Sequence, residues 1–216
     1  ELNGIVYDIT ESLALHWDGV AWNLVPSPNP SALPEQNLLV GVAAIAHDDV
    51  WAVGSHNETA GTGGPVAQTT ALHWNGFAWS VVPSPIIVIA SLSGGSSFNA
   101  VSALASNEVW AVGGRMMSAP GPDEAPLTAR WNGSAWNEVV APYVGNRVNR
   151  LFGVSARTPG DVWAVGTWRS LSTSFHILIE HWNGSAWSVV AAPDPGQNDQ
   201  LNAVSALAAN DAWAVG

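Results

Sequence analysis

Acidic residues recur along the chain at a spacing that could bring them together. Asp49, Glu108, Asp161 and Asp211 each stand two residues before a Trp in the same short segment. Carboxylate oxygens are the ligands that Ca²⁺ prefers, so these four are candidate calcium ligands. Asp at a turn more often accepts hydrogen bonds from nearby backbone N–H groups, and we favour that role. Glycoside hydrolysis needs two carboxyl groups at a fixed separation in one cleft, which evenly spread acids do not indicate.

A second set of polar residues recurs directly before another Trp. His16, His73 and His181 share a repeat position that holds Arg130 in the remaining unit. Arg cannot coordinate a metal, so we expect structural hydrogen bonding from this position. The chain has no Cys, no G-x-S-x-G and no H-E-x-x-H. We therefore predict no catalytic residues, no resident metal and no cofactor.

One group of aromatic and basic residues lies outside the repeat pattern, in the loops of a single unit. Such side chains could stack on a sugar and pair with carboxylate or sulfate groups. The alternative is that the arginines offset an acidic surface and that the one Trp packs a loop. The candidate ligand-binding residues are Tyr143, Arg147, Arg150, Trp168, Arg169 and His176.

A sequence repeat must position all of these residues. D-D-V-W-A-V-G at 48–54 returns in similar form at 107–113, 160–166 and 210–216. H-W-N-G-F-A-W at 73–79 also has a counterpart in each unit. Successive acids are 59, 53 and 50 residues apart, which is typical of propeller blades and close to the kelch period.

Each unit predicts four short strands. The first is small and apolar, the second is V-W-A-V-G, the third ends in H-W, and the fourth is W-x-V-V before a Pro-rich segment. The W-N-G segment predicts a hairpin turn in which Asn and Gly both accept a positive φ. The predicted fold is all-β: one propeller domain, 1–216, of four four-stranded blades. The units are expected at about 38–83, 97–141, 150–191, and 201–216 together with 1–26.

The two ends of the chain carry complementary half-units. The gap from the acid to the next H-W Trp is 25, 23 and 21 residues within the chain. Joining the end of the chain after Asp211 to its start before Trp17 would give 22. We therefore predict that the N- and C-terminal strands complete one blade and close a four-bladed ring without a free sheet edge. A homodimer that forms an eight-bladed ring, and a longer array of which this is a segment, remain alternatives.

Most of the 13 Trp belong to the scaffold, because twelve of them occupy three repeat positions. Large rigid side chains at fixed places in every unit indicate packing between blades. The loops after the second and fourth strands vary in length, and in a four-stranded blade they lie on one face. Variable loops on a rigid scaffold are typical of binding sites.

The D-V-W-A-V-G and H-W-N-G-x-x-W segments resemble the Trp-rich tandem propeller repeats of predicted secreted bacterial proteins. The resemblance covers almost the whole chain. It implies a propeller fold and an extracellular or cell-surface location, and it implies no activity. Kelch proteins share the period, but their Gly-Gly doublet is missing from three of the four units.

Composition narrows the function further. A chain that is 47% hydrophobic and 11% charged folds, and a net charge of −11 disfavours nucleic acids and anionic membrane surfaces. The longest uncharged apolar stretch, 38–46, is too short to insert into a membrane. We predict a non-catalytic extracellular binding or scaffold module whose partner is a glycan or another extracellular protein. The alternatives are a lectin-like glycan-binding module, and a hydrolase or lyase with a site at the central channel mouth.

Overall fold

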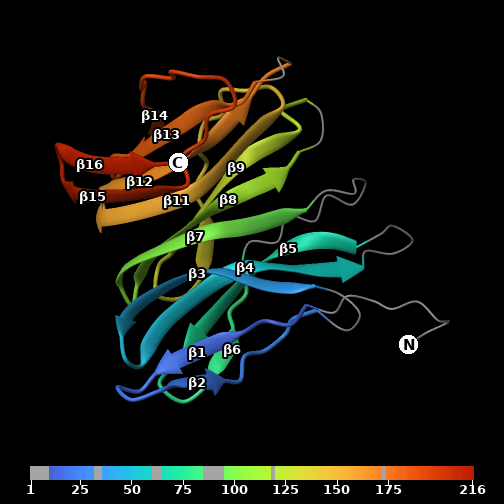
Figure 1. Cartoon of the computed structure of the whole chain (residues 1–216), viewed down its shortest axis with the longest axis vertical. Coiled ribbons are helices and arrows are strands. Elements are labelled where there is room, and N and C mark those ends of the chain that lie inside the picture. Colours follow the sequence, from blue (N-terminus) through green and yellow to red (C-terminus); the bar gives the residue numbers. More distant parts are fainter. Residues whose placement is uncertain (1–9, 32–35, 60–64, 85–94, 118–119, 172–173) are drawn as a thin grey trace.

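In the described part of the computed structural model, all regular secondary structure is β-strand. The structure describes residues 10–31, 36–59, 65–84, 95–117, 120–171 and 174–216. These residues contain no helix, so none is long and apolar enough to cross a membrane. The strands (Figure 1) are β1 Ala14–Trp17, β2 Trp22–Val25, β3 Asn37–Ala46, β4 Asp49–Thr59, β5 Pro65–Trp74, β6 Trp79–Val81, β7 Ser96–Ala105, β8 Glu108–Met116, β9 Glu124–Trp131, β10 Trp136–Glu138, β11 Val148–Thr158, β12 Asp161–Arg169, β13 His176–Trp182, β14 Trp187–Val189, β15 Ala203–Ala208 and β16 Asp211–Val215.

Twelve of these strands form three four-stranded antiparallel sheets. We call β3-β4-β5-β6 the first sheet, β7-β8-β9-β10 the second and β11-β12-β13-β14 the third. The remaining strands form two two-stranded sheets, the N-terminal hairpin β1-β2 and the C-terminal hairpin β15-β16. Figure 1 shows the sheets stacked in sequence order. The prediction of an all-β chain built from repeated four-stranded sheets is confirmed.

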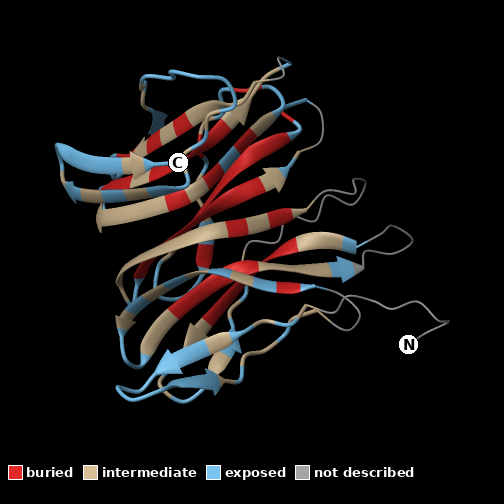
Figure 2. Cartoon of the chain, in the orientation of Figure 1, coloured by how far each residue is buried: buried red, intermediate tan, exposed pale blue. Residues whose placement is uncertain are grey.

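The core lies between successive sheets, and tryptophans bridge it. Trp51 of the first sheet enters the Trp131–Trp136 pair of the second, at ring centroid distances of 4.9 and 5.3 Å. Trp110 of the second sheet enters the corresponding pair of the third sheet at 5.3 and 5.5 Å. Trp51 and Trp110 are almost completely buried. Figure 2 shows burial concentrated in the middle of the stack and exposure at both ends. A repeated Trp therefore joins each sheet to the next.

The hairpin between the third and fourth strand of each sheet is a four-residue loop closed by an Asn side chain. In the first sheet the Asn75 Oδ1 accepts hydrogen bonds from the backbone N–H groups of Phe77 and Ala78, at 3.0 Å each. Gly76 has a φ of 91°. The expectation that Asn and Gly both adopt a positive φ is wrong, because the Asn side chain caps the turn and leaves the left-handed conformation to Gly alone.

Small residues let the first strands of neighbouring sheets approach closely. β3 packs on β7, β7 on β11, and β11 on β15. A Cβ at Gly41 would lie 3.3 Å from the Cα of Ala100, and one at Gly153 would lie 2.9 Å from the Cα of Ala203. A larger side chain at these positions would push the sheets apart.

The predicted closure of the ring does not form among the residues that the structure describes. The N-terminal and C-terminal hairpins are two separate sheets, and Figure 1 shows them at opposite ends of the stack. The spacing of the repeat defines which strands each half-unit lacks. It does not define the angle between successive sheets, which depends on how the tryptophans and the first strands pack. That angle decides how many sheets complete a turn.

Candidate functional site

The recurring acids pair with the residue before the third-strand Trp. The Asp49 carboxylate lies 2.9 Å from Nε2 of His73, and Asp161 lies 2.8 Å from Nε2 of His181. In the second sheet, where the acid is Glu108, the partner is Arg130. These contacts join the second strand of each sheet to the third. The expectation that the His position forms structural hydrogen bonds agrees with this geometry.

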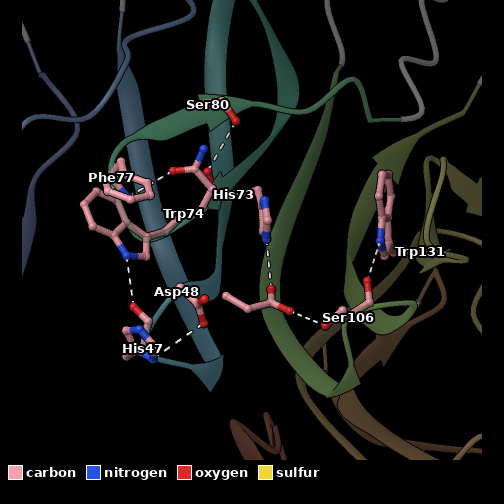
Figure 3. A network of polar contacts seen from close by, with 10 residues as sticks. His47, Asp48, His73, Trp74, Phe77, Ser80, Ser106 and Trp131 are labelled. Carbon is pink, nitrogen blue, oxygen red and sulfur yellow. Dashed lines mark hydrogen bonds and ion pairs between the residues drawn. The ribbon is translucent and has the colours of Figure 1, made fainter.

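One of these acids also joins two sheets. The second carboxylate oxygen of Asp49 accepts a hydrogen bond from the Ser106 hydroxyl, and Trp131 Nε1 donates to the Ser106 carbonyl oxygen at 3.0 Å (Figure 3). In a nucleophilic serine site the histidine contacts the hydroxyl. Here both Ser106 and His73 contact the carboxylate, so the arrangement does not activate the serine.

The Asp161 carboxyl group is held by two side chains, Arg157 and His181. Burial alone raises its pKa, but hydrogen bonds and charge from His181 and Arg157 outweigh burial, so the pKa of Asp161 is lowered from its ordinary value of 3.8. The Arg157 Nε lies 2.6 Å from Asp161. An ionised carboxylate is therefore part of the folded structure at neutral pH.

The four recurring acids do not assemble into a metal site. Within the described part of the chain, no group of three or more His, Cys, Asp or Glu side chains is arranged to hold a metal ion. Asp49, Glu108 and Asp161 are each bound to a side chain of the neighbouring strand. Asp211 lies in the C-terminal hairpin, where no third strand pairs with β16 among the described residues.

The candidate ligand-binding residues lie around one end of the third sheet. Trp168 and His176 pair directly across β12 and β13, and their rings stack at a centroid distance of 4.6 Å and an angle of 25°. The Arg169 guanidinium lies over the Phe175 ring at 4.6 Å. Tyr143, in the loop before β11, exposes 53% of its surface.

Backbone and ion-pair contacts bring two more of these residues to the same end. The Arg147 N–H donates to the Arg169 carbonyl oxygen at 3.1 Å. The Arg147 guanidinium pairs with Asp123 at 2.7 Å, and Arg150 binds Glu124 through two nitrogens at 2.6 and 2.9 Å. Glu124 is the first residue of β9 and Asp123 directly precedes it, so these arginines join the second and third sheets.

Most of the positive charge of this cluster is therefore already neutralised. His176 Nδ1 lies 2.5 Å from an Asp194 carboxylate oxygen. Among the described residues, no carboxylate forms a salt bridge with Arg169, whose Nε is buried without a hydrogen-bond partner. Trp168 is partly buried and packs against the core cluster of the second and third sheets. The exposed Tyr143 ring, Arg169 and the accessible part of the Trp168–His176 stack therefore remain as the groups that could meet a ligand.

A buried glutamate is the residue that sequence analysis missed. Glu180 in β13 is fully buried, and neither carboxylate oxygen has a hydrogen-bond partner. Burial raises the pKa of Glu180 to about 8. The same repeat position holds Leu15, Leu72 and Ala129 in the other units. An acid at a repeat position that is apolar in the other units could therefore have identified Glu180 from the sequence.

A second missed signal is the joint replacement in the second unit. Glu108 replaces Asp in the only unit in which Arg130 replaces His. Two simultaneous exceptions in one repeat indicate contact between the two positions, and the structure places them in contact.

Comparisons with known proteins give no assignment. No known family matches the sequence, and no curated protein matches it. Fourteen chains of known structure do match. One is described as YCF48 bound to D1 peptide, with 15% identity, a TM-score of 0.34, and coverage of 84% of this chain and 63% of that one. A TM-score this low does not establish a common fold, so we take neither architecture nor function from it.

Proposed function

We propose that this chain is a non-catalytic binding module whose stacked sheets form a propeller-type scaffold and whose ligand contacts the variable loop side of the third sheet. The supporting observation is that the recurring polar groups bind one another within the scaffold, whereas the groups that remain accessible lie outside the repeat. The acids and histidines that recur with the repeat hold neighbouring strands together, as in the Asp161–His181 pair. The groups left for a ligand lie outside the repeat, at Tyr143, Trp168 and Arg169.

We propose further that the module works outside the cell and that its ligand is a glycan or an extracellular protein. A glycan is favoured by the exposed Tyr143 ring near the Trp168–His176 stack, because aromatic faces pack against the apolar faces of sugars. Since Asp123 and Glu124 already bind Arg147 and Arg150, a neutral glycan fits this surface better than a strongly anionic one.

The experiment is a glycan array with the folded chain at low and high salt. The test variant is Trp168→Ala combined with Arg169→Ala. The control is Phe77→Ala, because Phe77 is also aromatic and 91% exposed but lies in a hairpin turn at the opposite end of the strands. Binding to one sugar family that is lost in the test variant and kept in the control supports a glycan-binding module.

Other outcomes are equally informative. A blank array from folded protein removes the glycan and leaves a protein ligand. Binding that weakens at high salt indicates that the charge of Arg169 contributes to the affinity for the glycan. Turnover of an ester or glycoside that stops in an Asp49→Asn or His73→Ala variant would show that the chain is an enzyme and overturn the proposal.

A further inference from the structure

The two ends of the stack expose apolar surface that soluble monomers normally bury. Trp17 and Trp22 in the N-terminal hairpin are 47% and 66% exposed, and Trp213 in the C-terminal hairpin is 69% exposed. Figure 2 shows both hairpins as largely exposed. Large exposed apolar patches mark interaction surfaces. We propose that a second copy of this chain covers them, with β1-β2 of one copy joining β15-β16 of the other into a four-stranded sheet.

The repeat defines the register of this junction. In the first sheet the second strand pairs with the third so that Trp51 faces His73, and Ala52 faces Leu72. Within the described residues, β16 pairs with β15 and β1 with β2, and neither has a further strand. Continuing the pattern places Trp213 opposite His16 and Ala214 opposite Leu15.

Polar side chains at the junction complement each other in the same register. Asp211 of one copy meets His16 of the other, as Asp161 meets His181 at 2.8 Å within the third sheet. The indole N–H of Trp182 donates to the Pro159 carbonyl at 3.1 Å, two residues before the acid. The corresponding bond at the junction runs from Trp17 to Ala209. The half-sheets therefore each supply the group that the other lacks.

The tryptophans of the N-terminal hairpin are already arranged to receive a partner. The Trp17 and Trp22 rings lie 5.9 Å apart at 52°. The Trp182–Trp187 pair, which receives Trp110, has a centroid distance of 6.0 Å and the same angle. In the part of the chain that the structure describes, no third Trp ring enters the Trp17–Trp22 pair.

Two cavities mark where the missing rings would enter. One of about 410 Å³ lies between the N-terminal hairpin and the first sheet and is lined by Trp74 and Trp79. Trp213 of the other copy would fill it, as Trp51 fills the space beside Trp131. The second, of about 290 Å³, lies between the third sheet and the C-terminal hairpin and is lined by Trp163. The Trp17–Trp22 pair of the other copy would close that cavity.

A second copy fits the geometry because the two hairpins lie at opposite ends of the stack (Figure 1). Head-to-tail association of two copies forms two identical junctions and closes a ring of eight sheets, a size that propellers adopt. Stable interfaces bury about 1,200–2,000 Å² in total. The tryptophans and leucines that the two hairpins expose are the surface that two such junctions would cover.

Cysteine cross-linking tests the register, because the chain has no Cys of its own. Leu15→Cys and Ala214→Cys would face each other across the junction, at a separation that a disulfide can bridge. We expect a mixture of the two single variants to form a disulfide-linked pair of chains, identified by mass and by its linked peptides. The matched control replaces Leu15→Cys by Val20→Cys, on an 85% exposed turn residue, and should not link above background.

The same residues distinguish a second copy from closure of one chain on itself. A chain carrying both substitutions that links at the mass of one chain, with unmodified protein sedimenting as a monomer, would overturn the proposal. Failure of the mixture to link, with a single-chain mass at all concentrations, would do the same.

Trp213→Ala provides an independent test. The side chain is mostly exposed in one copy, so its loss should leave the folded chain intact, as checked by circular dichroism. We expect the mass in solution to fall from two chains to one. A two-chain mass that persists in this variant would show that the interface lies elsewhere. Glycan binding on the loop side of the third sheet is a separate readout, so this proposal and the proposed function can fail independently.

Discussion

The Glu108 carboxylate accepts hydrogen bonds from Arg130 at 2.8 Å and 2.5 Å, at the position where the other two complete sheets contain an Asp–His contact. The longer acid and the longer base occur together and connect the same two strands. Arg130 also lies 5.6 Å from the Trp110 ring, which carries the contact to the third sheet. The pair therefore supports both its own sheet and the next interface.

A double-mutant cycle tests this exchange. Glu108→Asp alone leaves an Asp–Arg pair, and Arg130→His alone leaves a Glu–His pair; neither combination occurs at this position in the other complete sheets. Each single substitution should lower the free energy of unfolding by about 1–2 kcal/mol. The combined variant restores the Asp–His pair of the other sheets. Its loss of unfolding free energy should be smaller than the sum of the two single losses by at least about 0.5 kcal/mol. Urea unfolding of the four proteins measures the coupling. Strict additivity would show that the two side chains act separately.

The lowered pKa of Asp161 predicts a pH-dependent contribution to stability. Since the folded pKa lies below 3.8, the contribution is present above about that pH and is lost as the pH falls through the folded pKa. Asp161→Asn should cost about 1–3 kcal/mol at pH 7, because Arg157 and His181 lose a charged acceptor. Unfolding at a series of pH values should show the two proteins converging below pH 3.8.

The control for this measurement is Asp48→Asn. Asp48 also lies beside a histidine, His47, but at 3.6 Å and with 55% of its side chain exposed. Exposed pairs contribute little, so this variant should match the parent at every pH. An equal loss in both variants would mean that the effect comes from net charge rather than from the Asp161 contacts.

The repeated sheets could be predicted from sequence because their signals are local. The Trp, Asn-Gly (Asp18-Gly19 in the N-terminal hairpin) and small-residue positions recur in every unit, and each determines a strand, a turn or a close approach. Closure of the ring could not be predicted in the same way, because small angles between sheets accumulate along the stack. Local spacing identified the missing strands of the two hairpins and said nothing about the distance between them.

The candidate site was predictable only in part for a related reason. Trp168 and His176 come together because Trp168 lies near the end of β12 and His176 begins β13, and the repeat places these two strands side by side. The acids that neutralise Arg147 and Arg150 come from the preceding unit, and their partners are set by packing between sheets. The sequence alone suggests that the charges of Arg147 and Arg150 are available to a ligand, whereas in the structure both are bound to carboxylates.

Gly166, which ends the V-W-A-V-G segment of the third sheet, predicts a severe backbone effect. A Cβ at Gly166 would overlap the Arg150 carbonyl oxygen on β11 and lie 2.8 Å from the Leu151 Cα. Gly166→Ala should therefore lower stability by at least about 2 kcal/mol, because backbone must move. Gly160→Ala is the control, since its nearest neighbour would be the Gly184 Cα at 3.6 Å. Thermal unfolding that ranks the two variants equally would contradict this account.

Glu180 predicts that the chain gains stability when an acid is removed. The carboxyl is fully buried without a hydrogen-bond partner, and its pKa in the folded state is about 8 against an ordinary value of 4.5. A raised pKa means that stability is complete below pH 4.5 and is lost as the pH rises through about 8. The slope in this window approaches roughly 1.4 kcal/mol per pH unit.

Glu180→Leu, which restores the residue found at Leu72, should raise the free energy of unfolding at pH 7 by about 2–4 kcal/mol. The gain should shrink to a small remainder that no longer changes with pH below pH 4.5, where the carboxyl is neutral in both states but is still buried without a hydrogen-bond partner. Glu180→Gln keeps a buried polar group and should recover only part of it, because an unpaired amide still costs free energy to bury. Unfolding in denaturant from pH 4 to pH 9 measures the three curves. A constant difference between Glu180→Leu and the parent across this range would show that packing, rather than ionisation of Glu180, separates them.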